Sequence, residues 1–123
     1  MTVYKTPWCG CCEVWTEAMT KAGFNVEIRD LENLDMTKRQ AGVPDDLAAC
    51  HTATLGKYVI EGHVPLEAIQ KLLEEKPAIR GIAVAGMPQG SLGMGFDPAA
   101  RYDVMSFTYA KLEKPQVFYK AGL

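Results

Sequence analysis

Apolar and polar residues recur with two different periods along the chain, and these periods predict its secondary structure. Alternating positions rich in β-branched and aromatic residues indicate strands, whereas apolar residues spaced three or four apart indicate helices. The expected strands span residues 2–6, 24–29, 52–55, 57–60, 102–109 and 116–119, with a further extended segment at 79–85. The expected helices span residues 9–22, 34–41 and 65–76, with a helical turn at 44–47.

Two of the expected helices have a clear apolar face. The apolar positions expected to be buried are Val14, Trp15, Ala18, Met19 and Ala22 in the first helix and Leu66, Ile69, Leu72 and Leu73 in the third. A strand, a crossover helix and a second strand favour a parallel pair, and the later hairpins add antiparallel strands. The sequence therefore predicts an α/β fold with a mixed β-sheet flanked by helices and an added C-terminal β-hairpin. Because no repeat or linker divides it, residues 1–123 are expected to form a single domain.

Composition and charge narrow the range of partners. The chain has 123 residues, of which 48% are hydrophobic and 23% charged, as in an ordinary globular domain. A net charge of −2 offers no basic field for nucleic acid. The apolar runs are far shorter than the roughly 20 residues that span a bilayer, so no membrane insertion is expected.

The start of the sequence leaves the compartment open. Met1 is followed at once by a predicted strand and not by a basic segment with an apolar run. Two explanations remain: the protein is cytoplasmic, or an export signal has been removed and Met1 added.

Three of the four cysteines fall within four positions, at Cys9, Cys11 and Cys12. Cys9 and Cys12 have C-x-x-C spacing at a junction between a strand and a helix, where the positive helix end lowers thiol pKa values. The string resembles the thioredoxin motif W-C-G-P-C, with Cys11 in the proline position. A third thiol would open competing mixed disulfides in a dithiol enzyme, whereas three sulfurs suit a soft metal such as Cu(I). The alternative is that Cys11 is a small helix-start residue without a chemical role.

Further candidate ligands lie later in the chain. Cys50 is expected beside the C-x-x-C and is either a fourth sulfur ligand or a buried structural cysteine. His51 is a ligand, a hydrogen-bond donor to a ligand, or a histidine bonded to backbone. His63 precedes a helix start and has either a structural or a metal-binding role. Met87 and Met94 occupy a glycine-rich loop, where their thioethers would close over a Cu(I) site or fill gaps.

Together these motifs resemble a known family. The matching segments are Cys9-Gly10-Cys11-Cys12, Cys50-His51-Thr52, Gly62-His63-Val64-Pro65, and the loop from Gly86-Met87-Pro88 to Gly93-Met94. They are similar to small bacterial thioredoxin-like copper-binding proteins of the CopG type, formerly catalogued as a domain of unknown function. The resemblance runs from about Val3 to Tyr119, with one departure at Leu92, where the family loop more often has proline.

The resemblance implies a thioredoxin-like fold and a periplasmic protein that binds copper at the C-x-C-C cluster. It also implies clusters of several Cu(I) ions, a part in copper tolerance and other periplasmic copper-resistance proteins as candidate partners.

Three functions therefore compete. The first is Cu(I) binding by the four cysteines, completed by methionine or histidine and accompanied by copper-linked redox activity. The second is a thiol–disulfide oxidoreductase with Cys9 as nucleophile and Cys12 as the resolving thiol. The third is a structural domain whose cysteines hold zinc or a disulfide.

Overall fold

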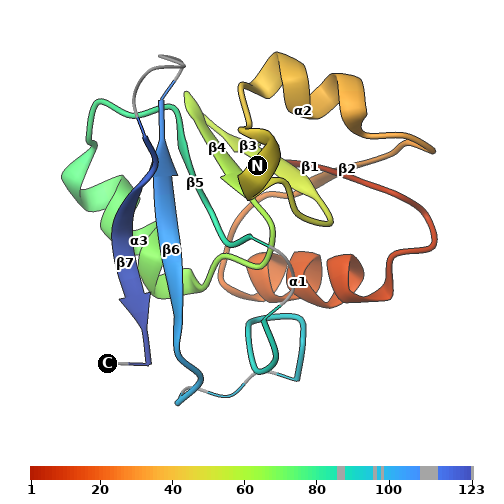
Figure 1. Ribbon diagram of the computed structural model, residues 1–123. Helices are drawn as coiled ribbons and strands as arrows, with labels where there is room; N and C mark the ends of the chain where they lie inside the picture. Colours follow the sequence, from red (N-terminus) through yellow and green to blue (C-terminus); the bar gives the residue numbers. More distant parts are fainter. Residues whose placement is uncertain (86–87, 96, 98, 109–113, 123) are drawn as a thin grey trace.

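The computed structural model describes residues 1–85, 88–95, 97, 99–108 and 114–122, which form one sheet with helices on both faces (Figure 1). The strands are β1 (Thr2–Lys5), β2 (Glu27–Asp30), β3 (Thr52–Leu55), β4 (Tyr58–Glu61), β5 (Gly81–Ala83), β6 (Tyr102–Phe107) and β7 (Gln116–Ala121). The helices are α1 (Gly10–Lys21), α2 (Asp35–Ala41) and α3 (Leu66–Glu75), with a short 3-10 helix η1 (Asp45–Leu47).

The sheet is mixed, as the sequence predicts. In the described residues its strand order is β2-β1-β3-β4-β5-β6-β7. The β1–β2 and β4–β5 pairs are parallel, and the other neighbouring pairs are antiparallel. The α/β class and the added C-terminal hairpin, β6–β7, are thereby confirmed. The order β2-β1-β3-β4 is consistent with the thioredoxin-like arrangement that the resemblance implies.

The sheet separates two apolar cores. Trp15 and Met19 of α1 pack with Ile69 and Leu72 of α3 on one face. Ala41 of α2 and residues near η1 pack on the other face, against Val59, Ala83 and Phe107. Adjacent residues of β4 alternate between the cores, as the two-residue period of a strand requires. No helix within the described ranges is long and apolar enough to cross a bilayer.

The buried face of α1 differs from the predicted one. Val14 is 52% exposed and Ala22 is also exposed. The buried residues of α1 are Cys12, Trp15, Thr16 and Met19. This face includes Thr16 because its hydroxyl donates a hydrogen bond to the Cys12 carbonyl at 2.7 Å and is therefore satisfied. The apolar stripe thus begins at a cysteine of the cluster.

The second strand also begins later than predicted. β2 covers residues 27–30, whereas Phe24 and Val26 precede it and pack against the core. Its four residues are exposed because β2 is an edge strand that pairs with β1 alone among the described strands. At the last hairpin, β6 ends at Phe107, and residues 109–113 of the predicted strand end and turn lie outside the described residues.

Neighbouring leucines of α3 provide a stability test. Leu72→Ala removes a fully buried side chain and is expected to lower the free energy of unfolding by about 3 kcal/mol. Leu73 is 38% exposed, so Leu73→Ala serves as the matched control and should cost less than about 1 kcal/mol. Denaturant unfolding of both variants checks this, and equal losses would contradict the packing described for α3.

Candidate metal centre

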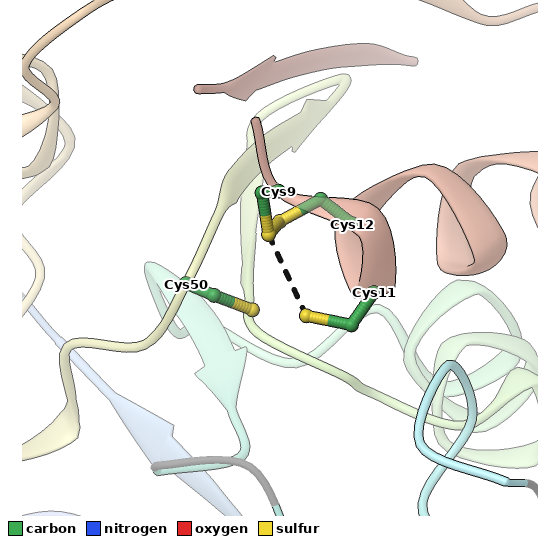
Figure 2. A group of neighbouring side chains, drawn as sticks. All are labelled: Cys9, Cys11, Cys12 and Cys50. Atoms are coloured by element: carbon green, nitrogen blue, oxygen red, sulfur yellow. Dashed lines mark hydrogen bonds between the residues drawn. A yellow bond between two sulfur atoms is a disulfide. The ribbon is translucent and has the colours of Figure 1, made fainter. Parts of the chain in front are cut away.

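Four cysteine sulfurs meet at the start of α1 (Figure 2). Cys9 directly precedes the helix, Cys11 and Cys12 lie in its first turn, and Cys50 comes from the segment before β3. All four Sγ atoms lie within 4.8 Å of one another. The expected convergence of Cys50 on the triplet is therefore present.

The four sulfurs are in two oxidation states. Cys9 and Cys12 form a disulfide with a Cα–Cα distance of 5.3 Å, whereas Cys11 and Cys50 are thiols. The Sγ atoms of Cys9 and Cys11 are 3.5 Å apart. In this state two thiols are available to a metal, and reduction of the disulfide would make four.

The local sequence places this cluster at a helix end. A turn closed by the hydrogen bond from Cys9 N to Thr6 O leads into α1, and Cys9 is its N-cap residue without a side-chain capping bond. The N-terminal end of α1, which carries a partial positive charge, therefore lies at the sulfur cluster. Cys12 is buried, while Cys9 and Cys11 are partly exposed, so the cluster is accessible from one side.

Both histidines lie beside Cys50. The Cys50 Sγ is 3.1 Å from His63 Nε2 and 3.4 Å from His51 Nδ1. The two imidazoles are fully buried. One ring nitrogen of each and Cys50 Sγ all lie within 4.8 Å of one another, so these three residues form a second group of possible metal ligands. Cys50 thus belongs to both the sulfur group and the histidine group.

Burial keeps this group neutral. Desolvation, with His63 and Lys38 nearby, lowers the pKa of His51 to about 3, and desolvation also lowers the pKa of His63. Burial and the neighbouring Cys11 raise the pKa of Cys50 to about 12. Neutral imidazole is the metal-binding form of histidine, whereas the Cys50 thiol must lose its proton when it binds a metal.

One buried nitrogen stands out in this group. Among the described residues, His51 Nε2 has no hydrogen-bond partner. Buried polar atoms are usually paired, so this nitrogen lacks a partner that a bound ion or water would supply. An unpaired buried nitrogen beside Cys50 is therefore compatible with a site that binds a metal ion.

Trp15 links α1 to the histidines, a role that the sequence analysis missed because it assigned this residue only to the core. Its Nε1 donates to Val64 O at 2.9 Å, and its ring centroid lies 4.4 Å from that of His51. The rings of His51 and His63 are stacked with centroids 5.5 Å apart. The position of Trp15, one helical turn after Cys12, is the signal that could have revealed this role.

The glycine-rich loop lies against the centre. At Gly93 (φ +102°) an added Cβ would lie 2.9 Å from Cys11 O and 3.5 Å from His63 Cε1, so glycine allows this close approach. Ser91 Oγ lies 3.5 Å from His63 Nδ1, and Met94 N donates to Ser91 O. Met87 lies outside the described residues, and coordination by Met94 stays a prediction.

Comparisons with known proteins agree with this geometry. A family profile described as "Protein of unknown function, DUF411" matches residues 47–94, which carry Cys50, both histidines and most of the loop. The copper resistance protein CopG, in Form 1, is 32% identical over 97% of this chain and 94% of that chain, with a TM-score of 0.86. This chain belongs to the CopG-type family of copper-resistance proteins. Form 2 of CopG gives a TM-score of 0.85 at the same identity and coverage, and no curated protein sequence matches the chain.

The raised pKa of Cys50 predicts slow alkylation. In the metal-free protein the Cys50 thiol should react with iodoacetamide far more slowly than a free cysteine at pH 8, and its rate should keep rising above pH 10. The control is the alkylation rate of the same chain unfolded in denaturant, where the cysteine pKa values are about 8.5. Mass spectrometry of the Cys50 peptide measures the rate, and equal rates in the folded and unfolded chain would refute the assigned burial effect.

Proposed function

We propose that the reduced protein binds Cu(I) through Cys9, Cys11, Cys12 and Cys50 and acts in copper resistance. The observation that carries this proposal is the convergence of four sulfurs within 4.8 Å at a helix N-terminus. Thiolates are soft ligands that favour Cu(I). Zinc would also accept four thiolates, but the family contains copper-resistance proteins, which favours copper.

The donor set supports more than one ion. Four sulfurs and two imidazoles, those of His51 and His63, form two overlapping groups that share Cys50. This is more than the four ligands that a closed tetrahedral site needs. We therefore propose a multi-copper cluster with cysteine sulfurs as bridges, and with Met94 or Met87 as further candidate ligands.

Copper binding and disulfide formation compete for the same sulfurs. When Cys9 and Cys12 form a disulfide, the cluster loses two thiolates. Oxidation of this dithiol releases two electrons and two protons, which balances the reduction of two Cu(II) ions to Cu(I). The copper-linked redox activity would take this form. Two molecules of an external thiol would then restore the dithiol by thiol–disulfide exchange and leave as their own disulfide.

Residues 1–123 would act as one domain in the periplasm, with copper ions and other copper-resistance proteins as partners. The support for this location is the resemblance to small bacterial copper-binding proteins, which implies a periplasmic protein. A cytoplasmic location is the alternative, and cell fractionation distinguishes the two.

An anaerobic Cu(I) titration against a competing chelator tests the principal proposal. Cys11→Ser and Cys50→Ser should each lower the affinity or the copper count of the reduced protein, with affinity falling by about tenfold or more, because each removes a sulfur ligand. Met94→Leu tests the thioether, with Met36→Leu as its control because Met36 is 68% exposed on α2. Copper binding by wild type no tighter than that of a Cys9→Ser, Cys12→Ser double variant would exclude the proposed site.

The Cys9–Cys12 disulfide also supports the second candidate, a thiol–disulfide oxidoreductase. Cys11→Pro restores the thioredoxin-like string and separates the two functions. A dithiol enzyme should keep or gain insulin-reducing activity, whereas the copper site should lose Cu(I) affinity by about tenfold because one sulfur is gone. Retained copper affinity together with increased reductase activity would favour the oxidoreductase.

A further inference from the structure

A buried carboxylate lies beside the metal centre, at the end of β4. Glu61 is fully buried and accepts three hydrogen bonds, from Lys38 Nζ at 2.5 Å, Thr52 Oγ1 at 2.5 Å and Ala49 N at 2.9 Å. A buried charge is costly unless it is paired and hydrogen-bonded. The Glu61 carboxylate has both kinds of compensation, because Lys38 is its ion-pair partner and three donors bond its oxygens.

Two of these donors flank the candidate ligands Cys50 and His51. Ala49 directly precedes that pair and Thr52 directly follows it, so a single carboxylate holds the segment on both sides. The backbone adds a third attachment, because Gly62 N donates to His51 O at 3.0 Å.

Gly62 allows this attachment to be close. It has a φ of +76°, and an added Cβ would lie 2.7 Å from Ala49 Cβ and 2.6 Å from Val84 O. Residues 49–52 are thus fixed against residues 61–62 at three points. A segment held in this way presents its sulfur with little conformational freedom left to lose on binding.

Lys38 connects this arrangement to α2, on the sheet face opposite α1. Its ammonium bonds both the Glu61 carboxylate and Thr52 Oγ1, at 2.5 and 3.0 Å. The Lys38 side chain is only 15% exposed, so the pair is largely shielded from water. Removing Lys38 alone would leave an uncompensated buried carboxylate.

We propose that Glu61, paired with Lys38, is a positioning residue that fixes the Cys50–His51 segment so that the Cys50 sulfur faces the cysteines of α1. This inference rests on the proposed copper function only for its copper measurement, because thiol proximity is measurable without copper.

Three variants separate positioning from general stability. The double variant Lys38→Met, Glu61→Leu replaces the pair by apolar side chains of similar volume, a change that often preserves or increases stability. Glu61→Gln is the conservative variant, because its amide oxygen still accepts from Ala49 N. Tyr58→Phe is the matched control: it deletes a hydrogen bond of 2.8 Å from Tyr58 Oη, at the other end of β4, to Pro77 O in the segment after α3.

The first measurement uses a trivalent arsenical, phenylarsine oxide, which bridges two thiols that lie close together. In a Cys9→Ser, Cys12→Ser background the bridge joins Cys11 to Cys50, and mass spectrometry measures its formation. The double variant should lower the bridging affinity by about tenfold, the usual effect of losing a partner that orients a ligand. Glu61→Gln should retain most of the bridging affinity. Tyr58→Phe should bridge as tightly as the Cys9→Ser, Cys12→Ser protein without further changes.

The second measurement, in the background with all four cysteines, is the Cu(I)–thiolate absorption band with chelator competition. The double variant should lose affinity by about tenfold and change the band, while its thermal unfolding shows that it is folded. Unchanged bridging and copper affinity in a folded double variant overturn the proposal.

Two other outcomes are also decisive. If the double variant unfolds, Thr52→Val replaces it: this change removes one of the two flanking bonds, and bridging equal to that of Tyr58→Phe then overturns the proposal. If wild type binds no Cu(I) but bridging still depends on Glu61, the copper function fails and the positioning role stands.

Discussion

Backbone pairing along one row of the sheet brings the chemical segments together. Tyr4 of β1 pairs with Thr52 of β3, Thr52 pairs with Glu61 of β4, and Glu61 pairs with Ala83 of β5. The chain leaves β1, β4 and β5, and enters β3, at this same end of the sheet. The C-x-C-C turn, the Cys50–His51 segment, the His63 segment and the glycine-rich loop must therefore adjoin one another. A slip of one residue in β3 would turn its side chains to the opposite face and displace Cys50 from this group.

Much of this arrangement could be predicted from local sequence. C-x-x-C spacing after a strand places thiols at a helix N-terminus whatever the rest of the fold, so Cys9 and Cys12 were identifiable. The position of Cys50 does not follow from local sequence, because its place beside the triplet is expected from a thioredoxin-like order of strands. That inference depended on topology, and the register of β3 bears it out.

Other features depend on tertiary contacts that no local pattern records. Val14 has the spacing of a core residue but is exposed. The face of α1 that packs on the sheet instead starts at Cys12 and includes Thr16, whose hydroxyl is hydrogen-bonded to the Cys12 carbonyl. Glu61 carries no motif, since a glutamate at the end of a strand usually contacts solvent. Its burial is compensated by Lys38, which approaches from a helix on the far face, and by the hydrogen bonds from Thr52 and Ala49.

The histidines illustrate how packing prepares the centre for a metal. Both imidazoles are fully buried, with the Trp15 ring against His51, and this burial lowers the pKa of each. Each imidazole is therefore neutral and has one nitrogen lone pair that can bind a metal. The same burial keeps Cys50 protonated in the metal-free state, which avoids an unpaired charge inside the fold. A bound cation would compensate a Cys50 thiolate, so ion binding and proton release are linked.

The position of Cys11 decides how this chemistry differs from that of an ordinary dithiol. Its sulfur lies 3.5 Å from that of Cys9, close enough to share an ion with it and also close enough to interfere with a disulfide-exchange reaction. A proline in place of Cys11 would leave Cys9 and Cys12 as an ordinary disulfide-forming pair at the start of α1. With cysteine there, and with Cys50 held opposite by the β3–β4 pairing, reduction would give four neighbouring thiols. A soft cation that displaced their protons would offset the repulsion between the resulting thiolates. If the site binds Cu(I) as proposed, opening the disulfide and binding the ion are linked, so the electron supply to Cys9 and Cys12 would set the capacity of the site for copper.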